Sequence, residues 1–127
     1  MMDYAAAGDL LTAYGEARRT FDGDDWVALF TEDAEYHEDP FGAPMVGHNA
    51  IRAYLLASAV RQRDVEFTVE RHWVSDSTVL AAWHATWVAR DGGHVIRMAG
   101  FLTAEIATDD RIDRFREWAA VAPGSGR

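Results

Sequence analysis

The spacing of the apolar residues changes from about 3.6 to 2 near Arg63, and this change limits the fold more than any other feature of the 127-residue sequence. Before Arg63, apolar side chains recur three and four positions apart, as in helices with one buried face. After it, Val65, Phe67 and Val69 alternate with polar residues, which indicates strands with one buried and one solvated face. Helices followed by a series of strands predict an α+β fold, with the helices on one face of a strongly bent, mostly antiparallel sheet.

Three helices are predicted before the change of period. The first covers residues 3–22 and has an apolar stripe that includes Tyr14. The second covers residues 25–31, after Asp24 as a good N-cap, and the third covers residues 48–62. A strand over residues 34–39, ended by Pro40, and a loop over residues 41–47 connect the second helix to the third.

Four further strands are predicted after the helices. The clearest signal is Asp91-Gly92-Gly93, a hairpin sequence in which glycine supplies the positive φ angle without steric cost. Turns are also expected at residues 75–77 and 108–110. The strands therefore run from Val65 to the first turn and over residues 78–90, 94–106 and 111–119.

The strand over residues 78–90 carries apolar residues on both faces, so we expect the outer face of the sheet to be covered as well. A second copy of the chain would cover it, which predicts a homodimer. In the alternative interpretation, Trp83 and Trp87 line the inner core instead.

Composition and charge limit the classes of partner that the chain is expected to bind. A net charge of −9 disfavours binding to phosphate backbones or anionic lipid, so neither nucleic acid nor a membrane is expected as a partner. No apolar run approaches the ~20 residues of a membrane span, and no secretory signal is seen at the N-terminus. The absence of cysteine excludes disulfides and thiolate metal sites. We expect one cytoplasmic domain over residues 1–122 and a disordered tail over residues 123–127.

Two stretches carry a resemblance to a known family: VALFTEDAEYHEDPFG, residues 27–42, and VGHNAIR, residues 46–52. They resemble the nuclear-transport-factor-2-like superfamily, which includes SnoaL-like polyketide cyclases and steroid delta-isomerases. The resemblance covers nearly the whole chain, and residues 111–118 also fit it. It implies a cone-shaped, cystatin-like α+β roll around an apolar pocket for a small hydrophobic molecule, with no metal or organic cofactor required.

The resemblance implies two catalytic residues. Asp39, held extended before Pro40, matches the base that moves a proton between carbons, and Tyr14 matches the tyrosine that stabilises the oxyanion. His37 or His84 could assist as a proton relay, since histidine titrates near neutral pH. In the alternative interpretation, Asp39 lies in an ordinary Asp-Pro turn and Tyr14 is a residue of the core, and neither is catalytic.

The sequence departs from the isomerases on the strand before Glu105. Their second oxyanion donor is an aspartate that matches Ala99 here, with the register uncertain by a residue or two. Arg97 shares a strand face with Ala99, and Glu117 matches a carboxylate in the pocket of the superfamily's epoxide hydrolases. Glu117 paired across strands with Arg97 or Arg116 is the alternative interpretation.

His37, Asp39 and His84 together could mimic a two-histidine, one-carboxylate iron site, but such short spacing often arises by chance, and we predict no metal. Two functions stay open: a cofactor-independent isomerase, cyclase or dehydratase acting on a polyketide- or steroid-like carbonyl compound, and a non-catalytic binding or assembly module. In either case the residues expected to contact the ligand are Trp26, Phe30, Tyr54, Arg97, Ala99, Phe101, Phe115 and Glu117.

Overall fold

The computed structural model describes residues 2–125 and confirms the α+β fold, with helices packed on an open, curved, six-stranded sheet. The strand order is β2-β1-β6-β5-β4-β3, and every neighbouring pair is antiparallel except β1 and β6. The elements are α1 (Tyr4–Thr20), α2 (Gly23–Val27), β1 (Phe30–His37), β2 (Met45–Val46), α3 (His48–Arg61), β3 (Gln62–Ser75), β4 (Thr78–Ala89), β5 (Val95–Ile106) and β6 (Ile112–Val121).

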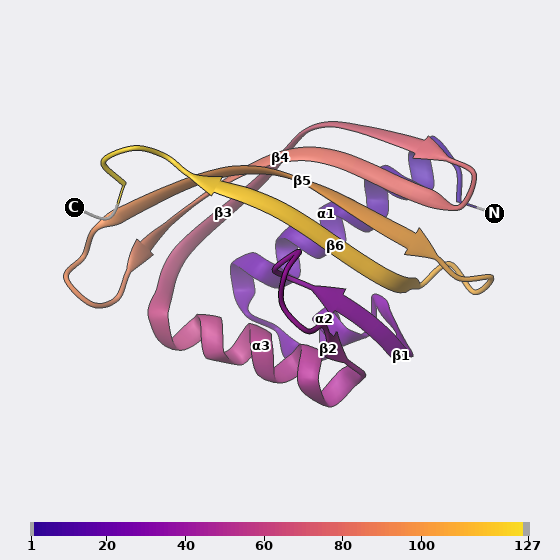
Figure 1. The fold of residues 1–127 in the computed structure, drawn as a ribbon, viewed down its shortest axis with the longest axis horizontal. Coiled ribbons are helices and arrows are strands. Elements are labelled where there is room, and N and C mark those ends of the chain that lie inside the picture. The colour runs from indigo at the N-terminus through magenta and orange to yellow at the C-terminus, as the bar shows by residue number, and fades with distance from the viewer. Residues whose placement is uncertain (1, 126–127) are drawn as a thin grey trace.

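The sheet curves over the helices, so that its concave face and the helices enclose the interior of the molecule (Figure 1). The strands after α3 form an antiparallel meander, as the alternating pattern predicts. No helix within residues 2–125 has the length and apolar character needed to cross a bilayer.

Aspartate side chains cap the N-termini of the first two helices. The side chain of Asp3 accepts a hydrogen bond from Ala6 N and begins α1, and Phe21 ends α1 in a left-handed conformation with φ of 53°. Asp22 then accepts from two backbone N–H groups and begins α2. The second helix is therefore earlier and shorter than the predicted 25–31, because Asp22 is the N-cap in place of Asp24.

The chain bends sharply where α3 runs directly into β3. β-Bulges interrupt the pairing of β3 with β4 between Arg63 and Glu66 and again between Val69 and Arg71. Asp64, within the first bulge, has a φ of 53°. Bulges increase local twist and bend a strand, so these two positions help to curve the sheet around the interior.

The predicted turns lie where the sequence places them. Gly92 and Gly93 have φ angles of 84° and 71° in the hairpin between β4 and β5. Pro123 to Ser125, the first part of the expected tail, form a turn in which Ser125 Oγ accepts a hydrogen bond from Arg97 N. The rest of that tail lies outside the described residues.

The core fills the concave side, with Trp83 among its buried members. Residues of β4 alternate across the sheet, so Trp83 and Trp87 both point inward while Leu80 and Ala82 lie on the convex face. The alternative interpretation of the two tryptophans is thus confirmed, although β4 still presents apolar side chains outward.

Candidate functional site

A cavity of about 490 Å³ lies between α1, α3 and the concave face of the sheet. Its sheet side is mostly apolar and its helix side is mostly polar. Exposed residues at its rim include Glu38, Arg61 and Val121. The lining residues are Tyr14, Arg18, Glu38, Tyr54, Ser58, Arg61, Gln62, Val65, Phe67, Trp83, Ala85, Trp87, Ala89, Ile96, Met98, Glu117, Ala119 and Val121.

A chain of hydrogen bonds joins two tyrosines to a carboxylate at this cavity. The hydroxyl of Tyr36 donates to Glu117 Oε1 at 3.2 Å, and the hydroxyls of Tyr14 and Tyr36 are 3.1 Å apart. Both tyrosines are almost completely buried. Because Tyr36 donates its hydrogen to Glu117, Tyr14 is the donor in the other bond, and the proton order runs from Tyr14 to Tyr36 to Glu117.

The environment of Glu117 makes it a proton acceptor suited to neutral pH. Burial raises the pKa of Glu117 from 4.5 to about 7, and the negative charge of Glu38 adds to this rise. The positive charge of Arg18 and the hydrogen bond from Tyr36 act in the opposite direction. A carboxylate with a pKa near the working pH serves as both base and acid. Burial likewise raises the pKa of Tyr14 above its usual value, so Tyr14 stays protonated.

Arg18 and Tyr54 complete the polar side of the cavity. Arg18 is one helical turn after Tyr14 on α1, and its guanidinium group lies 5.6 Å from the centre of the Trp26 ring. Its positive charge acts on the hydroxyl of Tyr54 on α3 and lowers the pKa of Tyr54, but burial has the larger effect and raises that pKa, so Tyr54 keeps its hydrogen. A protonated Tyr54 hydroxyl at the cavity can donate a hydrogen bond to a ligand.

The structure does not bring Asp39 and Tyr14 together. Asp39 is exposed in the turn after β1, where its side chain accepts a hydrogen bond from Phe41 N at 2.9 Å. It does not line the cavity, whereas its neighbour Glu38 does. Asp39 therefore lies in an ordinary Asp-Pro turn, as in the alternative interpretation of the sequence. Its predicted role as base stays a prediction.

The two histidines expected near the base also lie apart from the cavity lining. His37 Nε2 is 2.9 Å from Glu35 Oε1, and His84 Nδ1 is 3.0 Å from Glu70 Oε1. His84 faces outward on β4, since it lies between the inward-facing Trp83 and Ala85. No group of three histidine, aspartate or glutamate side chains within residues 2–125 is arranged to hold a metal ion.

The residues expected on β5 lie on the wrong face for the cavity. Met98 lines the cavity, so its neighbours Arg97 and Ala99 point to the convex side, and so does Phe101, which lies 6.0 Å from Trp73. The expectation that these three contact a ligand in the cavity is corrected by a shift of one residue, because adjacent strand residues point to opposite faces.

Of the other residues expected to contact a ligand, some line the cavity and others are buried behind its lining. Tyr14, Tyr54 and Glu117 line the cavity. Trp26, Phe30 and Phe115 are fully buried behind it, where Phe115 stacks on Tyr14 at 5.1 Å and on Tyr36 at 4.6 Å. These aromatic rings hold the tyrosine hydroxyls in place but do not themselves face the cavity.

Sequence reasoning missed Arg18 and Glu38. The spacing of four between Tyr14 and Arg18 places both on one helix face, and that spacing was available in the sequence. Glu38 had no comparable signal, because a glutamate at a strand end is usually a solvated residue.

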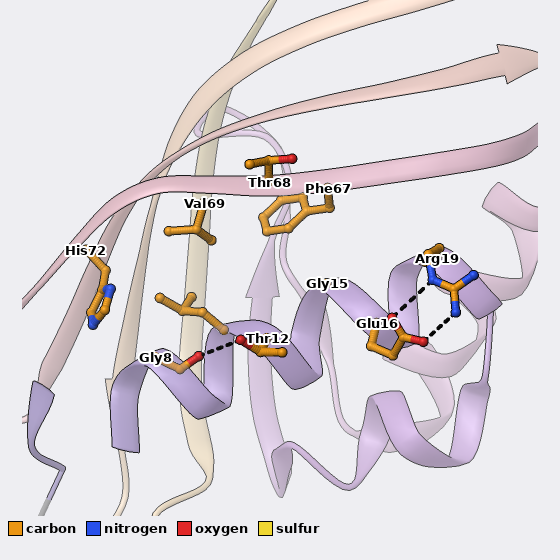
Figure 2. Close-up of a pocket in the computed structure, with 10 residues that line it drawn as sticks. Gly8, Thr12, Gly15, Glu16, Arg19, Phe67, Thr68, Val69 and His72 are labelled. Atoms are coloured by element: carbon orange, nitrogen blue, oxygen red, sulfur yellow. Dashed lines mark hydrogen bonds and ion pairs between the residues drawn. The ribbon is translucent and has the colours of Figure 1, made fainter. Parts of the chain in front are cut away.

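A second hollow of about 430 Å³ lies between α1 and β3, and Figure 2 shows its lining. Glu16 and Arg19, two charged residues that line it, form an ion pair with each other, in which Arg19 Nε donates to Glu16 Oε2 at 3.0 Å. Gly15 faces Phe67 of β3, where a Cβ atom would lie 3.1 Å from Phe67 Cδ1, so the absence of a side chain there lets α1 approach the strand. This groove gathers no arrangement of acid and base, so the cavity containing Glu117 is the candidate site.

The bent sheet, the helices on its concave face and the enclosed cavity define the nuclear-transport-factor-2-like class of folds. The family model of the SnoaL-like domain matches residues 11–115, which is more than half of the chain. The chain therefore belongs to the SnoaL-like domain family, which confirms the resemblance found in the sequence.

Solved structures agree in fold at low sequence identity. SalBIII, an epoxide hydrolase/cyclase-like enzyme of pyran ring formation in the polyether salinomycin, is 17% identical with a TM-score of 0.83, covering 94% of this chain and 95% of SalBIII. A protein from Shewanella denitrificans OS-217 named as a candidate SnoaL-like polyketide cyclase is 15% identical with a TM-score of 0.78, and 90% of each chain is covered. A computationally designed 17-OHP binder is 18% identical with a TM-score of 0.77, covering 91% of this chain and 98% of the binder. No curated protein matches by sequence.

Proposed function

We propose that the protein is a cofactor-independent proton-transfer enzyme of the isomerase, cyclase or dehydratase type, acting on a small hydrophobic carbonyl compound such as a polyketide or steroid-like molecule. The observation that carries this proposal is Glu117, a carboxylate that lines the cavity and whose pKa burial raises to about 7. Ordinary surface carboxylates are too weakly basic for this role at neutral pH.

In the proposed reaction, ionised Glu117 removes a proton from the carbon next to the substrate carbonyl. The electron pair of that C–H bond moves onto the carbonyl oxygen and forms an enolate. Tyr54 donates a hydrogen bond to this oxygen, and the positive charge of Arg18, which lowers the pKa of Tyr54, strengthens the donor. Protonated Glu117 then returns the proton to the same or another carbon of the enolate, which restores the base.

The predicted role of Tyr14 takes a different form in this proposal. Its hydroxyl hydrogen has Tyr36 as a partner, so Tyr14 acts on the base through Tyr36 rather than directly on the substrate oxygen. Tyr54 has the better position for the direct contact, because it lines the cavity beside the positive charge of Arg18.

A test that needs no knowledge of the natural substrate is exchange of the acidic C–H protons of 2-tetralone in D₂O, followed by NMR. We expect the protein to accelerate the exchange, and Glu117→Gln to slow the catalysed rate by about 10²–10⁴-fold. Asp39→Asn is the matched control and should keep the rate. Loss of rate in Asp39→Asn alone would return the role of base to Asp39, and no acceleration by the parent protein would contradict the enzyme proposal.

The second candidate function is a binding module that uses the same cavity without chemistry. It is favoured by β5, where the inward-facing Met98 supplies no second acid to the cavity. The designed 17-OHP binder is a protein of similar fold that is described as a binder. The exchange experiment separates this function from the first.

We also propose that the protein is a homodimer through the convex face of the sheet. Trp73 and Trp118 are each 37% exposed there, and Phe101 lies between them. These three residues form the convex aromatic patch. The arginines Arg71 and Arg116, stacked on its tryptophans, lie on the same face as the carboxylates of Glu70 and Glu105. A face with both signs of charge is complementary to itself across a two-fold axis, which favours a second copy as the occupant.

A further inference from the structure

We propose that the cavity takes an amphipathic carboxylate, whose acid group pairs with the guanidinium group of Arg18 while its apolar body lies along the sheet. The inference rests on the proposed function only in using the same cavity, and it narrows the ligand from a hydrophobic carbonyl compound to an organic acid.

The first observation is that Arg18 lines the cavity without a direct ion pair. Within residues 2–125 its guanidinium group contacts the Trp26 ring, and its charge acts on Glu117 and the tyrosines from beyond ion-pair distance. Five other arginines form direct ion pairs at or near the surface: Arg19, Arg52, Arg63, Arg111 and Arg114. A cation removed from water without a directly paired anion is costly. A bound anion at Arg18 would offset that cost.

The charged groups around Arg18 leave room for such an anion. Tyr14, Tyr36, Tyr54 and Glu117 surround it, and the tyrosines are neutral. Glu117 forms no ion pair with it and is partly protonated at neutral pH, since burial raises its pKa to about 7. Glu38 lies on the rim of the cavity, together with Arg61.

The shape of the guanidinium group selects the chemistry of the ligand. It offers five N–H donors in a planar fork, and this fork matches the two oxygens of a carboxylate. Because Arg18 lines the cavity and forms no ion pair within residues 2–125, its N–H groups are available for a ligand.

The rest of the cavity fits an apolar body. Trp83, Trp87, Ile96 and Met98 line the sheet side as a continuous apolar surface from β4 to β5. Their alternation along the strands directs all four side chains to the concave face. A ligand with its acid group at Arg18 and its apolar part on this surface satisfies both sides of the cavity.

The matched ligands octanoate and octanamide test the inference, because they share one chain and differ in charge. Isothermal titration calorimetry near pH 6 should show octanoate binding at least about tenfold more tightly. Arg18→Met should reduce octanoate affinity to that of octanamide and leave octanamide unchanged. Arg19→Met, an exposed neighbour on α1, should alter neither affinity. Equal affinities in the parent protein, or octanoate binding unaffected in folded Arg18→Met, would overturn the inference.

A second readout distinguishes a ligand at Arg18 from one elsewhere on the surface. Octanoate stays ionised from about pH 6 to pH 8, whereas Glu117 loses its proton over this range and then repels the anion. Octanoate affinity should therefore fall as the pH rises, and binding near pH 7 should take up a proton. Both effects should be absent in Glu117→Gln; a pH-independent affinity in the parent protein would contradict the inference. The 2-tetralone exchange is measured without a carboxylate, so either result can fail without the other.

Discussion

Tyr36 on β1 donates a hydrogen bond to Glu117 on β6, and the two residues are 81 positions apart in the chain. Tyr36 is fully buried and does not line the cavity, so it contacts the base without contacting a ligand. Its hydrogen bond stabilises the ionised form of Glu117 and lowers the pKa that burial has raised. Tyr36 is thus a positioning residue that tunes the proton affinity of Glu117.

Replacing Tyr36 by phenylalanine should raise the pKa of Glu117, because the ionised form loses a donor. The inflection in the pH dependence of 2-tetralone exchange should move to higher pH, and an NMR titration of the Glu117 carboxyl carbon should show the same shift. Tyr4→Phe is the control, since Tyr4 is exposed and stacks on His72 at 4.0 Å, away from the cavity. An unchanged titration in Tyr36→Phe would contradict the assigned role.

Glu117 should make the protein less stable as the pH rises. The unfolded chain releases this proton near pH 4.5, whereas the folded protein retains it up to about pH 7. The stabilising effect of the proton is complete below pH 4.5 and is lost as the pH rises through 7, at most about 3 kcal/mol in all. Urea unfolding should show Glu117→Gln to be more stable than the parent at pH 8 and similar to it at pH 4.5. Glu66→Gln, at an exposed position, should show no such crossover.

Gly100 allows Trp83 to lie flat against β5. A Cβ atom at position 100 would lie 2.6 Å from Trp83 Cζ2 and would also overlap the backbone oxygen of Trp118. We expect Gly100→Ala to destabilise the fold by about 1–3 kcal/mol and to displace Trp83 towards the cavity. Thermal unfolding and tryptophan fluorescence would measure the two effects. Gly42→Ala is the control, because its nearest contact would be an ordinary 3.4 Å to Asp39 Cβ. A parent-like fluorescence spectrum in Gly100→Ala would rule out the displacement.

The homodimer proposal depends on the convex aromatic patch. Trp118→Asp would place a charge within the convex aromatic patch, so sedimentation velocity should show a monomer where the parent is a dimer. Val60→Asp, a change at a 74% exposed apolar residue of α3, should leave the parent state unaltered. A monomeric parent at micromolar concentration would remove the proposal.

The order of helices and strands was predictable because it depends on local spacing. Apolar periodicity, the Asp91-Gly92-Gly93 hairpin and the family motifs were enough to predict the α+β roll. The N-cap of α2 was displaced by two residues, since Asp22 and Asp24 are equally good caps in sequence and only the left-handed end of α1 at Phe21 selects the first.

The site was less predictable because it depends on register and on contacts between distant segments. A shift of one residue on β5 exchanges Met98 for Ala99 at the cavity, and no local pattern distinguishes them. Tyr14, Tyr54 and Glu117 were found, but the bond between Tyr36 and Glu117 requires the pairing of β1 with β6. Asp39 was favoured by its motif, whereas the structure places the adjacent Glu38 at the cavity rim.

The parallel pairing of β1 with β6 also has a consequence for synthesis of the protein. Residues 30–37 have a neighbour on only one side, the two-residue β2, until residues 112–121 have been made. While the chain is still emerging from the ribosome, Tyr36 has no Glu117 to bond, and the interior has no closing wall on that side. Glu117 therefore joins the site only after β6 has been made, when the helices and strands β1 to β5 can already form. Chains that stop before residue 117 would contain Tyr14, Tyr36, Tyr54 and Arg18 but would lack the carboxylate.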